Sequence, residues 1–347
     1  MSAASPASPA SPIPGAPRRL SLARTGTPLE AAPRTSDALG VEVLFKRDDL
    51  TGAELTGNKV RKLEYLLAEA VDRGADTVIT CGGEQSNHAR ATALAAARVG
   101  LRSRLVLRTD DPARPPAATG NILLDRLAGA AIRWISRPDW ARRDAIMAEE
   151  AAAVDAAGGR AYVIPEGGSN AVGAWGYVGC AHELAADLAA LPARPTTIVH
   201  AVGSGGTTAG LVMGARMLGF GDRGVQVAGV NVCDDCDYFV AAVTRICGDM
   251  TARWPSLPRI APGDVQIVDG HVGLGYAKSR PEELATIRDL CRRDGLVLDP
   301  VYSGKAFHGV VTELARDRAR FGERIVFVHT GGIFGLFPVA AQLAPLL

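Results

Sequence analysis

The sequence predicts an α/β protein with two domains, each built from a mostly parallel sheet flanked by helices. Short β-rich runs alternate with helical stretches from Leu39 onward, and this alternation occurs twice along the chain. Strands that alternate with helices typically form parallel sheets covered on both faces. The length of 347 residues suits about two domains at roughly 150 residues each. Ligands of such folds bind at the carboxyl ends of the strands, so a site is expected between the two domains.

The first run of elements lies between residues 41 and 164. The helix predicted at 59–73 carries apolar side chains at helical spacing, namely Val60, Leu63, Leu66, Leu67, Ala70 and Val71. The strands are short stretches rich in β-branched and apolar residues. They are predicted at 41–45, 77–80, 105–107, 131–135 and 162–164, with further helices at 86–99, 120–128 and 141–157.

The second run repeats this scheme between residues 197 and 328. A strand at 197–201 leads through a glycine-rich loop into a helix at 207–218, which is the order expected of a parallel unit. The remaining strands are predicted at 225–232 and 324–328, and the remaining helices at 281–293 and 303–316.

Composition narrows the class of protein. Hydrophobic residues make up 47% and charged residues 22% of the chain, and the formal net charge is +1, so nothing favours nucleic acid or an anionic membrane surface as a partner. Residues 1–17 are rich in Ser, Ala and Pro and lack the basic and apolar regions of a secretory signal. They predict a disordered tail. No apolar run approaches the ~18 residues of a membrane span, and we expect a cytoplasmic protein.

The six cysteines do not predict a disulfide framework or a metal site. They are scattered along a long chain, and only Cys233 and Cys236 have the C-x-x-C spacing. No second cysteine or histidine pair accompanies them, so a zinc or redox role is not favoured.

A glycine-rich loop follows the strand at 197–201. Its residues Gly203, Ser204, Gly205, Gly206 and Thr207 lie directly between a strand and a helix, where backbone N–H groups and the helix N-terminus can bind an anion. The dinucleotide and Walker patterns both fail here, and a compact phosphate site fits better. The alternative is a tight turn without a ligand.

Lys59 stands at the start of a predicted helix, after a Gly-Asn turn. An amine in this place, together with a phosphate site, indicates a Schiff base to a phosphorylated aldehyde, pyridoxal 5'-phosphate. The alternative is a solvated lysine at a helix start.

Three further turns place polar residues at strand ends. In the first, Ser86, Asn87 and His88 open a helix, where they could bind a carboxylate, although Ser86 could also act only as an N-cap. In the second, Tyr302 could stack on an aromatic cofactor and Ser303 could cap a helix or bond a ring nitrogen. In the third, Thr330 precedes a Gly-Gly pair. Such turns together predict a cleft built from parallel-sheet loops.

These turns together resemble the fold-type II pyridoxal phosphate enzymes, the tryptophan synthase β-like group, and more closely the D-cysteine desulfhydrase and 1-aminocyclopropane-1-carboxylate deaminase family. The similarity extends from Leu20 to Phe337. It is carried by Lys46-Arg47-Asp48-Asp49, Gly57-Asn58-Lys59-Val60-Arg61-Lys62, Gly83-Glu84-Gln85-Ser86-Asn87-His88, Pro165-Glu166-Gly167-Gly168-Ser169, Asp299-Pro300-Val301-Tyr302 and His329-Thr330-Gly331-Gly332.

The resemblance implies a role for each residue of the site. Lys59 would form the Schiff base and remove the α-proton, Asn87 would bond the phenolic oxygen of the cofactor, and Tyr302 would stack on its ring. Residues Gly203 to Thr207 would hold the phosphate. The substrate carboxylate would bind at Ser86, Asn87 and His88, with Thr330 nearby, and Tyr276 matches a second active-site tyrosine. The resemblance also implies a large cofactor-binding domain at 18–60 and 171–347, a small domain at 61–170, and a homodimer.

Two positions favour the desulfhydrase branch of that family. The deaminases carry a glutamate where this chain has Ser303 and a leucine where it has Thr330. A hydroxyl at the ring nitrogen would leave the ring neutral, which suits elimination of a β-substituent. We expect D-cysteine to be converted to pyruvate, sulfide and ammonia. The alternatives are sulfite release from L-cysteate, β-chloroalanine breakdown, ring-opening deamination, and a catalytically silent protein that binds the cofactor or an amino acid.

Overall fold

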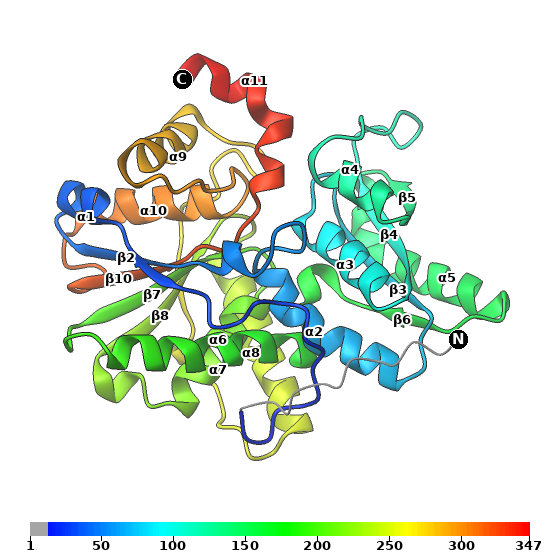
Figure 1. The fold of residues 1–347 in the computed structure, drawn as a ribbon, viewed down its shortest axis with the longest axis horizontal. Helices are drawn as coiled ribbons and strands as arrows, with labels where there is room; N and C mark the ends of the chain where they lie inside the picture. Colours follow the sequence, from blue (N-terminus) through cyan, green and yellow to red (C-terminus); the bar gives the residue numbers. More distant parts are fainter. Residues whose placement is uncertain (1–12) are drawn as a thin grey trace.

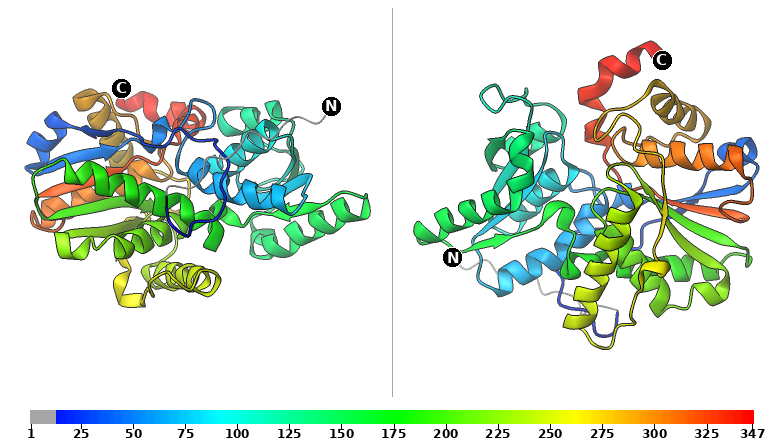
Figure 2. Two further views of the ribbon diagram at one scale, coloured as in Figure 1. Left: turned by 60° about the horizontal axis from the view of Figure 1, so that its bottom comes forward. Right: turned by 180° about the vertical axis from the view of Figure 1, so that it is seen from behind.

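The computed structural model describes residues 13–347 and contains two sheets that lie side by side (Figures 1 and 2). The larger sheet has the strand order β1-β2-β10-β7-β8-β9 and the smaller one β5-β4-β3-β6. The larger consists of β1 (Leu29–Ala31), β2 (Glu42–Lys46), β7 (Thr196–Val202), β8 (Val225–Asn231), β9 (Gln266–Val268) and β10 (Arg324–Val328). The smaller consists of β3 (Thr77–Gly83), β4 (Arg102–Arg108), β5 (Ala131–Ile135) and β6 (Ala161–Val163). Every pairing is parallel except that of β1 with β2.

Helices cover both faces of the larger sheet (Figure 1). Alternate residues of β2 point to opposite sides, as a strand requires: Val43 and Phe45 pack toward α9 (Pro281–Asp294) and α10 (Ser303–Arg316), whereas Leu44 faces the other core. That second core is formed with α2 (Asn58–Asp72), α6 (Ala171–Ala189), α7 (Gly206–Met217) and α8 (Cys236–Arg253).

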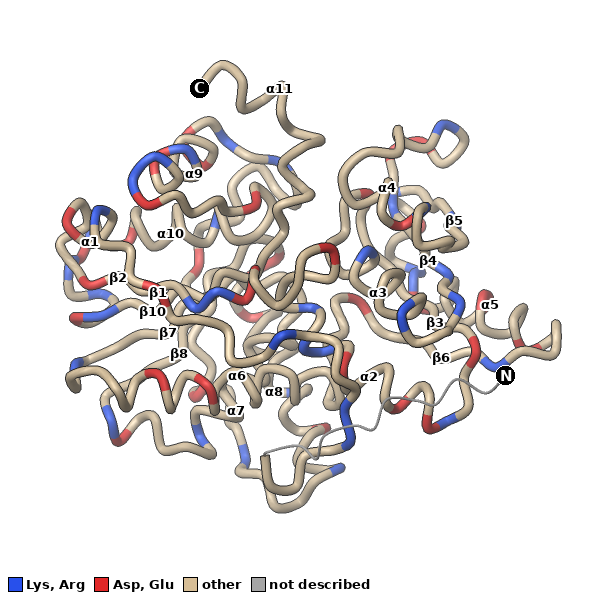
Figure 3. The backbone as a smooth tube through the Cα atoms, viewed as in Figure 1, with Lys and Arg blue, Asp and Glu red and all other residues tan. Residues whose placement is uncertain are grey.

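The smaller sheet is also covered on both faces. Leu105 and Leu107 of β4 pack against α3 (Asn87–Arg98), and Val106 between them packs toward α5 (Arg143–Ala156). The short helix α4 (Gly120–Leu127) lies against α3. Helix α2 contacts both α3 and α6, so it joins the two halves of the molecule. Basic and acidic positions are interspersed around both sheets (Figure 3).

The predicted α/β class and its parallel sheets are confirmed, and each predicted strand and helix overlaps one that the structure contains. The sequence alone did not predict β1, α1 (Pro33–Leu39), α6, α8, β9 or the short helix α11 (Ala340–Leu343) near the carboxyl end. The domain boundaries after residues 60 and 170 stay predictions. None of the helices within residues 13–347 is long and apolar enough to cross a membrane.

The predicted tail is too long. Residues 1–12 lie outside the described residues, but Ile13 has only 4% of its surface exposed and belongs to the core formed with α2 and α6. The packed chain therefore begins before residue 18, because one isoleucine in a segment rich in Ser, Ala and Pro finds an apolar place between helices.

Candidate active site

Lys59 lies in the first turn of α2, and the backbone before it is fixed by close packing. Gly57 has φ 93° and would bring a Cβ atom within 2.7 Å of the Thr330 carbonyl oxygen, so only glycine fits there. The Gly57 N–H donates to Thr51 Oγ1 at 2.8 Å, and the Asn58 N–H donates to the Thr330 carbonyl at 3.1 Å. The Lys59 turn is thereby held against the late Gly-Gly turn.

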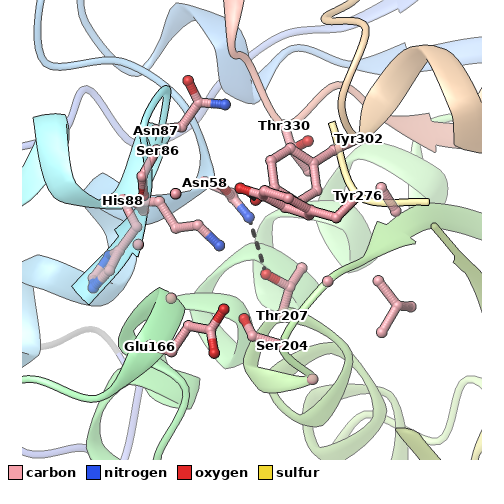
Figure 4. A pocket seen from close by; sticks show the side chains of 18 of the residues that line it. Asn58, Ser86, Asn87, His88, Glu166, Ser204, Thr207, Tyr276, Tyr302 and Thr330 are labelled. Atoms are coloured by element: carbon pink, nitrogen blue, oxygen red, sulfur yellow. Dashed lines mark hydrogen bonds between the residues drawn. The ribbon is translucent and has the colours of Figure 1, made fainter. Parts of the chain in front are cut away.

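Lys59 lines a cavity at the carboxyl ends of β3 and β7. Figure 4 shows other residues that line this cavity. The predicted residues that line it are Lys59, Ser86, Asn87, His88, Gly203, Ser204, Gly205, Thr207, Tyr276, Tyr302 and Thr330. Of the predicted set, Gly206 and Ser303 do not line the cavity.

The Lys59 amine has a lowered pKa. Burial lowers it to about 8, although the charges of Glu166 and Asp299 act in the opposite direction. Lys59 is half-buried, and within residues 13–347 its amine has neither a hydrogen bond nor an ion pair. A lysine of this kind is ready to react with a carbonyl group.

The glycine-rich loop has the donor groups of a phosphate site. Gly205 has φ 82°, and a Cβ atom on Gly203 would come within 2.8 Å of the Tyr302 ring. The Gly206 N–H donates to Ser169 Oγ, but among the described residues the N–H groups of Ser204, Gly205 and Thr207 have no acceptor. Free N–H groups at the start of a helix suit an anion, so this loop fits the phosphate group of the predicted cofactor.

Lys62 is a second amine beside this loop, and the sequence reading gave it no role. It is 1% exposed, and its Nζ lies 3.1 Å from the Gly167 carbonyl and 3.4 Å from Ser169 Oγ. A Cβ atom on Gly206 would lie 2.9 Å from that Nζ. Burial, and then the charge of Lys59, hold the pKa of Lys62 well below its ordinary value. A buried amine without a carboxylate partner in the described chain fits next to a phosphate.

The turn at Ser86 opens α3 on the other side of the cavity. Ser86 Oγ accepts from the Ala89 N–H at 3.1 Å, so the capping interpretation is confirmed. The N–H groups of Asn87 and His88 have no acceptor within the described residues and remain open to an anion.

The His88 ring points away from the cavity (Figure 4), with its Nε2 2.8 Å from Thr80 Oγ1. Burial, with the charges of Lys59 and Lys62, holds the pKa of His88 well below its ordinary value. The ring therefore brings no charge to a carboxylate at this place.

Two tyrosines close the opposite side of the cavity (Figure 4). The hydroxyl groups of Tyr276 and Tyr302 are 2.8 Å apart, and their rings meet edge to face with centroids 5.9 Å apart. Burial raises the pKa of Tyr276 to about 12 and that of Tyr302 well above its ordinary value. Both phenols are thus protonated near neutral pH and can donate a proton.

Ser303 occupies a different environment from the one expected. Its hydroxyl donates to Asp299 Oδ1 at 2.5 Å, and its Oγ accepts from the Asp299 N–H. The same carboxylate accepts the N–H groups of Val301, Tyr302 and Ser303. Asp299, and not Ser303, therefore caps the start of α10, because a carboxylate can accept all of these bonds at once. Contact of Ser303 with a ring nitrogen stays a prediction.

Glu166 is another cavity residue to which the sequence reading assigned no role. It lies in the quoted Pro-Glu-Gly-Gly-Ser segment, and its carboxylate pairs with Arg143 at 3.3 Å. Burial raises its pKa, while Arg143 and Arg108 act in the opposite direction. Its position in a glycine-rich segment was the available signal.

Comparison with known proteins shows the family of this chain. The family model described as "Pyridoxal-phosphate dependent enzyme" matches residues 20–331. The chain is 40% identical to the bifunctional D-cysteine desulfhydrase/1-aminocyclopropane-1-carboxylate deaminase, mitochondrial, of Arabidopsis thaliana, over 98% of this chain and 84% of that protein. It is 42% identical to a putative 1-aminocyclopropane-1-carboxylate deaminase of Thermotoga maritima, over 94% and 99%. The D-cysteine desulfhydrase of Serratia proteamaculans is 38% identical, over 94% and 97%.

Solved structures of other proteins are similar to this chain. A crystal structure of an "ACC deaminase homologue" superposes with a TM-score of 0.84 at 37% identity, covering 95% of this chain and 96% of that one. A fungal L-serine ammonia-lyase from Rhizomucor miehei, at 18% identity and a TM-score of 0.63, shares the fold. The family model and these relatives confirm the predicted cofactor, and the chain belongs to the pyridoxal-phosphate dependent enzymes of fold type II.

Proposed function

We propose that the enzyme catalyses β-elimination from a small amino acid, and that its substrate is D-cysteine, which it converts with one water to pyruvate, sulfide and ammonia. The names of the Serratia and Arabidopsis relatives support a desulfhydrase. Ser303 and Thr330 support it further, because they stand where the deaminases of the resembling family carry glutamate and leucine. The observation that carries the proposal is the unpaired Lys59 amine between a phosphate loop and an open helix start.

Pyridoxal phosphate, when bound, supplies an electron sink that stabilises negative charge on the carbon next to the substrate nitrogen. Lys59 Nζ is the base that takes the α-proton, and its lowered pKa of about 8 makes the neutral amine easier to reach than for an ordinary lysine. The cavity holds this nitrogen near the reacting carbon, and such proximity supplies much of the rate.

The substrate carboxylate binds, in this proposal, at the start of α3. The free N–H groups of Asn87 and His88 and the Ser86 hydroxyl lie there, at the positive end of the helix dipole. This placement turns the amino group toward Lys59 and the β-carbon toward the tyrosines.

The leaving group departs on the tyrosine side. The electron pair of the Cα–H bond forms the Cα=Cβ double bond, and the electron pair of the Cβ–S bond leaves with sulfur as hydrosulfide. The protonated Tyr276 and Tyr302, linked at 2.8 Å, are placed to donate a proton to it. The remaining three-carbon enamine takes up one water and yields pyruvate and ammonia.

Sulfide release from D-cysteine, with L-cysteine in parallel, tests the proposal. We expect release from the D-isomer alone and none from Lys59→Ala, while borohydride reduction followed by peptide mapping should place the cofactor on Lys59 in the unsubstituted enzyme. Folding of the variant is checked by circular dichroism. Sulfide release by Lys59→Ala at the rate of the unsubstituted enzyme would contradict the assigned base.

Ring-opening deamination is the second candidate, because the Thermotoga relative carries that name. The enzyme would then release 2-oxobutanoate from 1-aminocyclopropane-1-carboxylate and no sulfide from D-cysteine. L-Cysteate and β-chloroalanine, assayed for sulfite and chloride, distinguish the remaining eliminations. A homodimer and a cytoplasmic location stay predictions.

A further inference from the structure

A chain of directed hydrogen bonds leads from a buried arginine to the cavity. Arg90 of α3 is 0% exposed, and its Nε donates to Asn121 Oδ1 at 3.2 Å. Asn121, in the first turn of α4, is also 0% exposed and donates from Nδ2 to Asn87 Oδ1 at 3.0 Å. These three residues connect the small-sheet interior to the predicted ligand of the cofactor's phenolic oxygen.

The donor and acceptor groups around Asn121 determine which way the amides of Asn121 and Asn87 are turned. Arg90 can only donate, so the Asn121 atom that faces it must be the carbonyl oxygen. The Asn121 Nδ2 also donates to the Gln85 carbonyl at 2.9 Å, and a carbonyl can only accept. With both ends of the Asn121 amide assigned, Asn87 must turn its own oxygen toward Asn121 and its nitrogen away from it.

The free end of the Asn87 amide therefore faces the cavity with its N–H groups. A Cβ atom on Gly332 would lie 2.8 Å from Asn87 Nδ2, and Figure 4 shows that nitrogen turned toward the side where Thr330 and Tyr302 lie. The glycine of the late Gly-Gly turn leaves the space that this donor needs.

The other bonds of Arg90 and Asn121 hold the chain in place. The remaining Arg90 nitrogens donate to the carbonyls of Glu54 at 2.7 Å and Thr56 at 3.2 Å, in the segment that leads into the Lys59 turn. The Asn121 N–H donates to Gln85 Oε1 at 2.8 Å, and the Gln85 amide donates to the Thr119 carbonyl. The same network thus positions the Lys59 turn and the start of α4.

We propose that Asn121 is a positioning residue that fixes the Asn87 amide with its N–H toward the phenolic oxygen of the cofactor, and that Arg90 sets the direction of Asn121. The inference rests on the proposed function and on the contact with the phenolic oxygen that the family resemblance implies for Asn87. A donor at that oxygen draws negative charge from it, so the oxygen holds less tightly the proton that it shares with the Lys59 nitrogen.

Asn121→Asp tests the orientation of the Asn87 amide, because it removes the Nδ2 donor and leaves the side-chain volume almost unchanged. The new carboxylate still accepts from Arg90 but cannot donate to Asn87, so the Asn87 amide must turn and present its oxygen to the cofactor. We expect the pH midpoint of the absorbance change of the bound cofactor to rise by about one to two units, since a hydrogen bond to a charged group is lost. Asn121→Ala should give a smaller rise, because Asn87 is then unrestrained.

Leu123→Ala, an exposed position of the same helix, is the matched control and should leave the midpoint unchanged. In an Asn87→Ala background, Asn121→Asp should shift nothing further if it acts through Asn87. An unchanged midpoint in Asn121→Asp with cofactor bound, or an equal shift in the Asn87→Ala background, would overturn the inference. The midpoint is measured without substrate, so absence of sulfide release would contradict the proposed function and leave this test intact.

Discussion

At the scale of single residues, Lys59 and Lys62 are two amines one helical turn apart that lie in different surroundings. Lys59 faces the cavity, and Lys62 lies beside the phosphate loop, 1% exposed and without a carboxylate within the described chain. The sequence pointed to Lys59 because it follows a Gly-Asn turn at a helix start, and a family motif also contains it. Lys62 belongs to the same motif, but only the fold brings Ser169 and the Gly206 loop to its amine.

Lys62→Met is expected to have two opposite effects. It should weaken cofactor binding about 10- to 100-fold, because a charged hydrogen bond to phosphate is lost. It should also stabilise the cofactor-free protein, since a buried amine is replaced by an apolar side chain of similar length. Cofactor titration by fluorescence and urea unfolding without cofactor measure the two effects. The exposed Lys278, changed to Met, is the control, and unaltered cofactor affinity in Lys62→Met would contradict the assignment.

At the scale of elements, α6 shows why some helices could not be predicted from the sequence. Periodicity predicted amphipathic helices such as α2 and α10, and glycine-rich turns after strands predicted the cavity. Helix α6 is rich in Ala and Gly and has buried residues around most of its circumference, so no apolar stripe marks it. The capping role considered for Ser303 belongs to Asp299, and the sequence could not decide between them because both residues are suitable caps.

An ion pair also links helices α2 and α6. Glu183 of α6 binds Arg61 of α2 through both oxygens at 2.7 and 2.8 Å, and Arg61 in turn binds the buried Asp48. Burial raises the pKa of Glu183, but the hydrogen bonds and charge of Arg61 outweigh it and lower that pKa to about 2.

Glu183→Gln should therefore lower the free energy of unfolding by about 2–3 kcal/mol at pH 7. A lowered folded-state pKa stabilises the protein above the unfolded value, and this contribution is lost as the pH falls toward 2. The difference between the two proteins should thus be constant above pH ~5 and shrink below pH ~4. Urea unfolding over this range tests it, with exposed Glu323→Gln as the control. A pH-independent difference would exclude ionisation as the cause.

At the scale of the whole molecule, the cavity draws its residues from both sheets. Ser86 follows β3 of the smaller sheet and Gly203 follows β7 of the larger one. A ligand that binds both sides stabilises the folded molecule as a unit. The alternating pattern predicted both sheets, but which strand ends meet depends on strand order. Sequence did not predict that β10 lies between β2 and β7.

Removal of the cofactor should lower the stability of the whole protein. Free cofactor at 100 times its dissociation constant is expected to add about 2.7 kcal/mol to the free energy of unfolding. Urea unfolding of stripped and reloaded enzyme measures this value, and Lys59→Ala should gain less at the same concentration. Unfolding curves that coincide with and without cofactor would show that binding is not coupled to the folded cavity.

The central position of β10 has a consequence for synthesis on the ribosome. Strand β2 ends at Lys46, and its partner β10 begins 278 positions later, at Arg324. At about 5–20 residues per second, the sheet waits roughly 15 to 60 s for its middle strand. Until then β2 presents an unpaired edge, joined by that of β7 once Val202 is made, whereas the smaller sheet, complete by Val163, can already close. The nascent chain is therefore most exposed to aggregation and to chaperones in its last stage, when most of its cofactor site has already been translated.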